Sequence, residues 1–101
     1  MTIKFGKTDP LKIVAKDQDG DVVLPLPDAV VNHTVQENMI GPIDLLTGNF
    51  VFTADNVAGD DSLTATVANV TSSPFVETVV APVVTTVEIQ AQVATVSIQP
   101  Q

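Results

Sequence analysis

The sequence predicts an all-β domain, and three observations lead to this prediction. The 101 residues include 18 Val and 12 Thr, which are β-branched side chains that fit the pleated surface of a sheet. Short runs alternate apolar and polar side chains with a period of two, and Asp, Asn, Gly and Pro separate these runs. No window repeats apolar residues at helical spacing for long enough to predict a helix. About seven to eight short strands are therefore expected, arranged as a β-sandwich with extended terminal segments.

The first half of the chain predicts four extended segments. Alternation is clearest where Leu11, Ile13 and Ala15 face one way and lysines face the other. An Asp-Gly pair at 19–20 predicts a tight turn after them, because it readily supplies a left-handed backbone. Two prolines then confine the next segment to a sheet edge or a loop. The expected segments are a first strand or arm at 2–7, a strand at 11–16, an edge or loop at 21–26 and a central strand at 29–36.

The second half is organised around residues 47–80, which read as three strands in succession. Leu63, Ala65 and Val67 point to one face, and the threonines between them point to the other. Asp55, Asp60 and Asp61 precede this run and are expected to cluster in a loop. They could offer ligand oxygens there, but solvation of the loop is the better interpretation. The expected strands are 50–53, 63–70 and 75–80, preceded by a short strand or bend around 39–43.

Composition excludes several classes of function. Net charge is −8 at pH 7, so nucleic acid is not an expected partner, because phosphate binding needs clustered Lys and Arg. Cysteine is absent, which removes disulfides and thiolate metal sites. No apolar stretch has the length of a membrane span or of a signal peptide. If Met1 is the natural start, the protein is made in the cytoplasm and is not exported by the usual route.

Charge is distributed unevenly along the chain. All four lysines lie in the first 16 residues, whereas the rest of the chain carries 11 of the 12 acidic side chains. A subunit with a basic end and an acidic body that packs against its neighbours would show this asymmetry. An acidic, solvated surface with scattered lysines would show it as well, and the pattern alone leaves both interpretations open.

The order LKIVAKDQDGDVVLPLPDAVVNHTV, then MIGPID, then TGNFVFTADNVAGDDSLTATVANVTSSPFVETVV resembles the bacterial immunoglobulin-like (Big-type) domains of phage structural proteins and bacterial surface proteins. Those modules commonly show a D-x-x-G turn, matched at 17–20, and a Val-x-aromatic strand, matched by Val31 and His33 in place of the usual Trp. Gly59 and the SLTATV run match their glycine-led strand. The resemblance covers about residues 11–80 and implies an immunoglobulin-like β-sandwich.

Three segments are expected from this comparison. They are an N-terminal basic arm or edge strand at 1–10, the immunoglobulin-like sandwich at 11–82 and a β-prone C-terminal extension at 83–101. The extension alternates apolar and polar residues and would aggregate if left free. We expect it to pair either with its own sandwich or with a neighbouring molecule by strand addition.

Candidate sites are few. Asp17, Asp19 and Asp21 have the spacing of calcium ligands, but Val22 stands where a calcium loop needs Gly, so an Asp-Gly hairpin turn is the better interpretation. His33 is the single histidine, and its place on a strand predicts a core or semi-core residue. No catalytic residues and no cofactor are expected. The expected partner-binding residues are Lys4 and Lys7 in the arm and Val87, Ile89, Val93, Val96 and Ile98 in the extension.

Two functions from different classes fit these observations. The first is a non-enzymatic phage virion protein, a capsid decoration or auxiliary capsid protein or a tail protein, that oligomerises and binds other virion proteins through its termini. It would be made in the host cytoplasm and reside in the virion. The alternative is an adhesive or carbohydrate-binding module at the bacterial cell surface, which would bind glycans through exposed loops. Four Phe and no Tyr or Trp argue against aromatic sugar-binding platforms.

Overall fold

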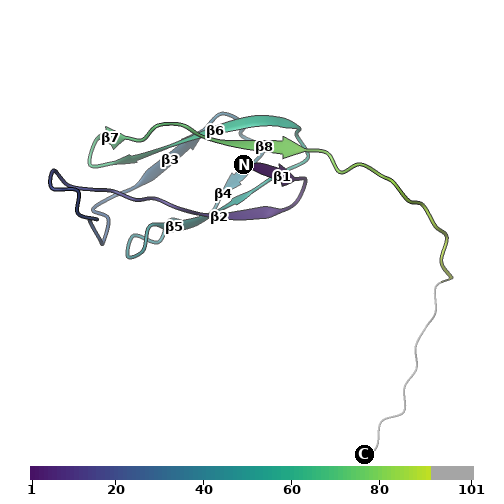
Figure 1. Ribbon diagram of the computed structural model, residues 1–101, viewed down its shortest axis with the longest axis horizontal. Helices are drawn as coiled ribbons and strands as arrows, with labels where there is room; N and C mark the ends of the chain where they lie inside the picture. The colour runs from purple at the N-terminus through teal and green to yellow at the C-terminus, as the bar shows by residue number, and fades with distance from the viewer. Residues whose placement is uncertain (92–101) are drawn as a thin grey trace, which may run out of the picture.

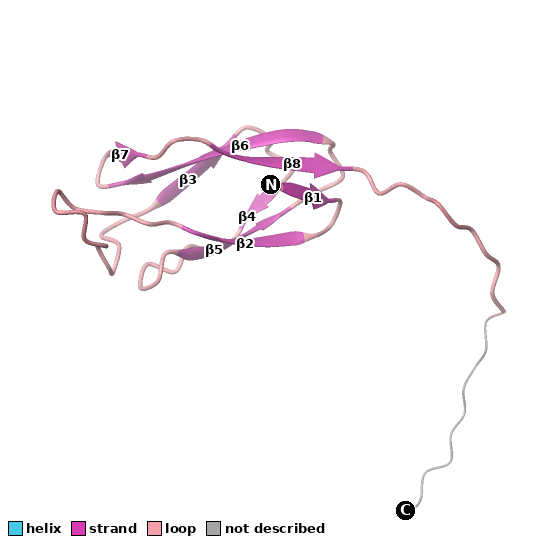
Figure 2. Ribbon diagram, viewed as in Figure 1, coloured by secondary structure: helices cyan, strands magenta, loops and turns pink. Residues whose placement is uncertain are grey.

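The computed structural model describes residues 1–91, which form eight strands in two sheets, with no helix among them (Figures 1 and 2). The expected all-β class and the expected number of strands are both confirmed. The strands are β1 (Thr2–Lys4), β2 (Thr8–Lys12), β3 (Val30–His33), β4 (Met39–Ile40), β5 (Asn49–Thr53), β6 (Gly59–Val67), β7 (Val70–Thr71) and β8 (Phe75–Val80). In this part of the chain no helix is long and apolar enough to cross a membrane.

The two sheets lie face to face as a β-sandwich (Figure 2). The larger sheet has the order β1-β8-β6-β3, with β7 folded back on β6, and the smaller sheet has the order β2-β5-β4. Neighbouring strands are antiparallel, except that β1 runs parallel to β8. The chain crosses from β1 in the larger sheet to β2 in the smaller one through a turn at Gly6, whose φ is +72°.

The core lies between the sheets and is built by the alternation of each strand. In β5, Phe50 and Phe52 point inward while Asn49 and Val51 remain exposed. Phe52 is fully buried. Apolar burial of this kind supplies the main driving force for packing the two sheets together. The buried apolar residues are Ile3, Ile13, Leu26, Phe50, Phe52, Ala54, Leu63 and Val79.

The strand expected at 11–16 lies earlier in the chain. β2 ends at Lys12, after which the N–H of Ile13 donates to the carbonyl oxygen of Gly48 at 2.9 Å. The chain then leaves the sheet in a hairpin, in which a single bridge joins Lys16 to Val22. The alternation that predicted a strand here continues on this hairpin, outside the regular pairing with β5.

The strand expected at 63–70 also has different limits. β6 begins at Gly59, and its pairing with β8 places Asp60 and Asp61 inside the sheet, not in a loop. At its other end the chain reverses through Ala68 and Asn69, whose φ angles of 48° and 66° make a two-residue hairpin turn into β7. The sequence did not predict this turn because Ala68 and Asn69 stand where such a turn usually has a Gly.

Beyond β8, residues 81–91 form an extended segment that leaves the sandwich (Figure 1). Every residue of this segment is exposed, and Ile89 is 100% exposed. We call residues 81–91 the tail. The predicted partner-binding residues Val87 and Ile89 lie in it, whereas Val93, Val96 and Ile98 lie outside the described residues.

Candidate functional site

Asp61 on β6 is the centre of a buried hydrogen-bond network. Its Oδ2 atom accepts from Nδ1 of His33 and from Nδ2 of Asn38, each at 2.9 Å. Its Oδ1 atom accepts from the backbone N–H groups of Thr34 at 2.9 Å and Val35 at 3.2 Å. An ionised carboxylate has no proton to give, so His33 carries a proton on Nδ1. These bonds fasten the segment that follows β3 to the inner face of β6.

The network fixes the ionisation of Asp61. Burial by itself would raise the pKa of this carboxyl, because desolvation disfavours the charged form. The hydrogen bonds from Asn38, His33 and the two backbone N–H groups together outweigh burial and hold the pKa below its ordinary value. Asp61 is therefore charged although its side chain is fully buried.

Two polar side chains extend this network to other parts of the sandwich. Asn38 is only 2% exposed, and its Oδ1 accepts from the backbone N–H of Asp55 at 2.8 Å. The hydroxyl oxygen of Thr34 accepts from the backbone N–H of Ser62 at 3.0 Å. Asp61 thus ties together the β3–β4 connection, β6 and the loop after β5.

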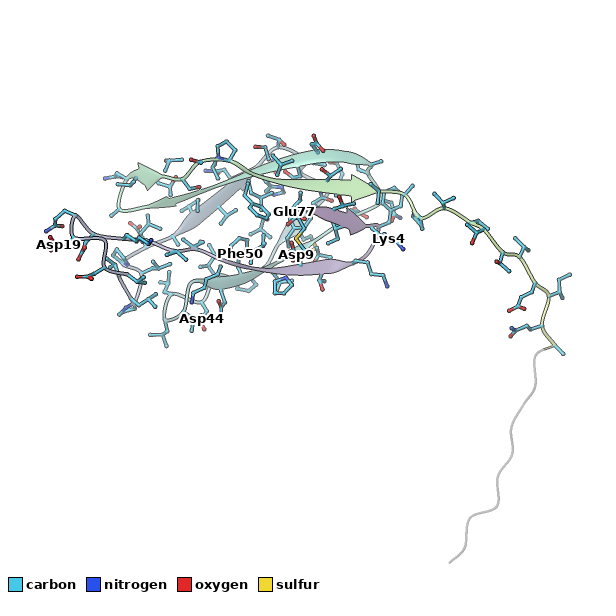
Figure 3. All side chains as sticks on the ribbon, in the orientation of Figure 1. Lys4, Asp9, Asp19, Asp44, Phe50 and Glu77 are labelled. Atoms are coloured by element: carbon cyan, nitrogen blue, oxygen red, sulfur yellow. The ribbon has the colours of Figure 1, made fainter. Side chains whose placement is uncertain are left out.

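A second pair of buried acids, Asp9 on β2 and Glu77 on β8, lies between the two sheets (Figure 3). Asp9 is 6% exposed and Glu77 is fully buried. Neither Oδ2 of Asp9 nor either carboxyl oxygen of Glu77 meets an N–H or hydroxyl donor among residues 1–91. Two carboxylates in this position would repel, so a proton must be held between them.

Glu77 holds that proton. Burial raises its pKa to about 8, and the hydrogen bond and the negative charge of Asp9 act in the same direction. The N-terminal ammonium of Met1 lowers the pKa, and the charge of Asp61 raises it further. At neutral pH the raised pKa keeps Glu77 neutral, and its carboxyl faces that of Asp9 between the two sheets.

Neither cluster is accessible to a substrate. The carboxyls are buried, and the ring of His33 is 13% exposed. The expectation that His33 is a core or semi-core residue is thus confirmed. Its Nδ1 is oriented by a carboxylate as in a hydrolase, but among the described residues no hydroxyl group forms a hydrogen bond with Nε2. The His33–Asp61 pair positions backbone, which is a structural role.

The expectation that Asp61 is a solvated loop residue was wrong. The alternation of side chains along the strand was an available signal. Asp61 lies two residues before Leu63, so both side chains point to the same, inward face. By the same alternation, Asp9 shares the inward face of Leu11, and Glu77 shares the inward face of Val79. In all three strands, an acid occupies a position at which the period of two calls for an apolar side chain.

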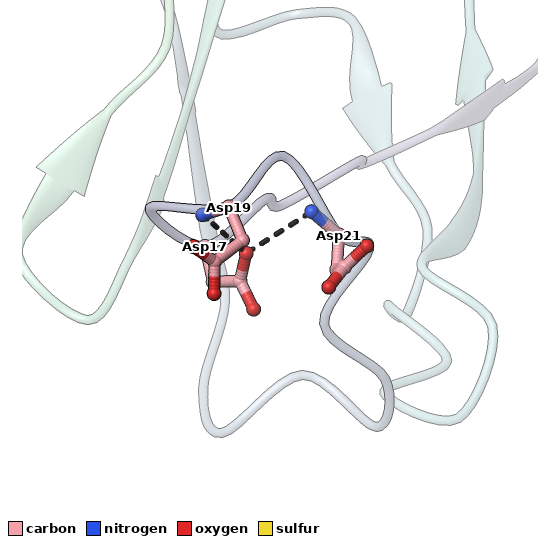
Figure 4. A group of neighbouring side chains, drawn as sticks. All are labelled: Asp17, Asp19 and Asp21. Carbon is pink, nitrogen blue, oxygen red and sulfur yellow. Dashed lines mark hydrogen bonds between the residues drawn. The ribbon is translucent and has the colours of Figure 1, made fainter.

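The exposed loop of Asp17, Asp19 and Asp21 is a hairpin turn (Figure 4). The three carboxylates approach within 4.8 Å of one another. Oδ1 of Asp17 accepts from the backbone N–H groups of Asp19 at 2.9 Å and Asp21 at 3.0 Å. Gly20, with a φ of +82°, donates to the carbonyl oxygen of Asp17 at 3.0 Å. Turn formation accounts for these contacts, as the sequence predicted.

The remaining predicted residues lie at the two ends of the chain. Lys4 and Lys7 are exposed, at the end of β1 and in the turn that follows it. Val87 and Ile89 are exposed in the tail. β1 lies near the start of the chain and the tail follows β8, but β1 pairs with the last three residues of β8. The two terminal segments therefore lie at the same end of the sandwich.

Comparison with protein-family models, with curated proteins and with solved structures found no match.

Proposed function

We propose that this protein is a non-enzymatic structural protein that assembles through its terminal segments, and that it belongs to a phage virion as a capsid decoration, auxiliary capsid or tail protein. The observation that carries this proposal is the tail. Val83 and Val84 are 83% and 77% exposed, and Val87 is 84% exposed. Exposed β-branched residues in an extended segment favour pairing with another chain over solvation.

The strand order supports an immunoglobulin-like sandwich for the proposed virion protein. In such sandwiches the C, F and G strands form one sheet, and the B, E and D strands lie in the other. Here β3, β6 and β8 would be C, F and G, and β2, β5 and β4 would be B, E and D. The first strand, β1, would be an A strand that pairs with G. This correspondence agrees with the sequence resemblance to Big-type domains.

The charge distribution supports assembly. The four lysines are all exposed, and most of the acidic residues lie in the body of the domain. Contacts between the basic first segment of one subunit and the acidic body of a neighbour would be attractive at low salt. Other virion proteins and further copies of this chain are the proposed partners.

Incorporation into particles tests this function. Phage particles would be purified from cells that produce either the full chain or a chain ending at Pro82, and mass spectrometry would measure the protein in each. The full chain is expected in the particles and the truncated chain is not, while circular dichroism shows that both are folded. Equal incorporation of both chains would show that the tail is not needed.

Two further observations bear on the same proposal. A capsid or tail gene adjacent to the gene for this chain would support it. Specific binding on a glycan array would instead favour the adhesive or carbohydrate-binding module at the bacterial surface.

A further inference from the structure

An apolar groove opens between the two sheets. It has a volume of about 240 Å³ and lies between the segment that follows β2 and the segment that precedes β8. Leu11, Ile13, Phe50 and Leu63 form much of its lining, and Phe75 at the start of β8 is 44% exposed at its rim. Ile13, Phe50 and Leu63 are buried at its floor, whereas Phe75 and Val14 leave apolar surface exposed at the rim. A sandwich edge with an exposed apolar rim is suited to receive a further strand.

The β2 side of the groove also offers unpaired backbone. The N–H of Ile13 donates to Gly48, and the carbonyl oxygen of Lys7 accepts from Ala54, so odd-numbered residues between them face β5. Backbone groups alternate with a period of two, and the even-numbered positions Pro10 and Val14 therefore face outward. Pro10 has no N–H and blunts its part of the edge. Val14 has both groups, and neither has a backbone partner among residues 1–91.

The tail has the complementary properties. Its residues Val87 and Ile89 alternate with polar residues, which is the pattern of a strand that buries one face. Its single charged residue is Glu88, and the single charged residue that lines the groove is Lys12. Eleven extended residues span roughly 36 Å, more than enough to cover the groove.

We propose that the tail of one molecule adds as a strand beside Val14 of a second copy of this chain, with Val87 and Ile89 filling the groove. This inference rests on the proposed assembly through the terminal segments and names the acceptor. The occupant is a second copy because β8 runs away from the groove, from Phe75 to Val80, and the tail continues outward from Val80 (Figure 1). To reach its own groove it would have to turn back past β1, which covers the edge of β8 there.

Site-specific disulfide trapping tests the contact directly, because the chain contains no cysteine. The full chain carrying Val14→Cys would be mixed with the full chain carrying Ile89→Cys under mild oxidation. The mixed disulfide dimer is expected to form at least about tenfold faster than with the control Met39→Cys. Met39 is 67% exposed against 53% for Val14 and lies on β4, at the opposite edge of the same three-stranded sheet. Equal rates with the two acceptors would overturn the proposal.

Charged substitutions in the tail provide a second, independent measurement. Sedimentation of the full chain is expected to show reversible self-association, and Val87→Asp with Ile89→Asp should weaken it by at least about tenfold. Thr86→Asp with Gln90→Asp places the same two charges on the opposite face of the tail and should weaken self-association less than about threefold. These positions are exposed, so the fold should be unaffected. A full chain that remains monomeric at every concentration would overturn the proposal.

Failure here is distinguishable from failure of the proposed function. A tail that is required for incorporation into particles but that does not trap at Val14 would retain the virion function and remove this groove as the acceptor. Trapping at Val14 by a chain that is absent from particles would retain the groove and remove the virion function.

Discussion

Asp61 and Glu77 are directly opposite each other on neighbouring strands β6 and β8, both fully buried, and their pKa values are shifted in opposite directions. Opposite residues in an antiparallel pair share a face of the sheet. The difference is one of hydrogen-bond donors. Asp61 receives four N–H groups within 3.2 Å, whereas Glu77 faces another carboxyl, that of Asp9.

This contrast predicts that the free energy of unfolding is larger at mildly acidic pH than at alkaline pH. The pKa of Glu77 is about 8 in the folded protein against an ordinary value of 4.5, so its stabilising contribution is full below pH 4.5 and is lost as pH rises through about 8. The lowered pKa of Asp61 acts in the other direction, since its contribution is present above the ordinary value of 3.8 and is lost as pH falls through the folded value. Both contributions are at full strength between pH 3.8 and 4.5, so the stability from these two groups is expected to be highest at about pH 4.

Glu77→Gln should remove the alkaline loss of stability. The amide donates to Asp9 at every pH, so urea unfolding should show a flatter profile between pH 5 and 8. Since one pKa unit corresponds to about 1.4 kcal/mol, the variant should be more stable than the native chain at pH 8 by on the order of 3 kcal/mol. Glu88→Gln, at an exposed position of the tail, is the control and should leave the profile unchanged. A variant that retains the native slope would show that Glu77 does not hold the shared proton.

Asp61→Asn should destabilise the fold strongly. The introduced amide group faces buried donors where the carboxylate had accepted, leaving at least one of them without a partner, at a cost of about 3 kcal/mol. The neighbouring Asp60→Asn is the control, because Asp60 is exposed and its carboxylate accepts from the hydroxyl of Thr78 at 2.8 Å. Its effect should stay below about 0.5 kcal/mol. Similar unfolding midpoints in urea for both variants would contradict the role assigned to Asp61.

Gly48→Ala and Gly20→Ala distinguish two costs of adding a Cβ atom. One is the backbone strain of a positive φ, and the other is a steric clash with a neighbouring backbone atom. Both glycines have a φ of +82°, but a Cβ at Gly20 would meet open space while one at Gly48 would collide with the carbonyl oxygen of Ile13. Gly20→Ala should cost about 1 kcal/mol of unfolding free energy. Gly48→Ala should cost at least about 3 kcal/mol, because the backbone of Ile13 must move out of its bond to Gly48. Equal losses in thermal unfolding would show that the Ile13 backbone moves freely.

Ala68→Asn should stabilise the β6–β7 hairpin. Ala68 has a φ of 48°, a left-handed conformation that Asn tolerates better than Ala. The backbone N–H of Ala68 donates to Asp28 at 2.7 Å, and this bond does not depend on the side chain. The gain should be about 0.5 to 1 kcal/mol in urea unfolding. Ala58→Asn, exposed and without a positive φ, should give no gain.

The sequence predicted the class of the fold well, because it depends on repeated features. Phe50 and Phe52 alternate with polar or exposed neighbours, and the turn at Gly20 follows from an Asp-Gly pair. The limits of β2 and β6 depended instead on distant partners. β2 ends where Gly48 takes the N–H of Ile13, and β6 begins at Gly59 because β8 pairs with it from there. Contacts of this range cannot be read from a local pattern.

The buried acids escaped prediction for a related reason. A carboxylate is normally exposed, and hydrogen-bond donors offset the cost of burying Asp61. Two are backbone N–H groups, and the two side-chain donors are those of His33 and Asn38. These donors lie 28 and 23 residues before Asp61 in the sequence. Glu77 has no such donors and is tolerated inside because it keeps its proton beside Asp9, which lies on the other sheet.

The place where the tail leaves β8 has a consequence for symmetry. The tail and the groove beside Val14 are different surfaces of one chain, so each copy can give its tail to one neighbour and accept the tail of another. Such a contact is heterologous. It closes into a ring when the rotation between neighbouring copies divides a full turn, and otherwise it continues as a helical filament. Mutual exchange of tails between two copies gives a twofold dimer. Because the tail leaves the sandwich after Val80, its docking on another copy would open three forms of assembly to this chain: a closed ring, a fibre and a swapped pair.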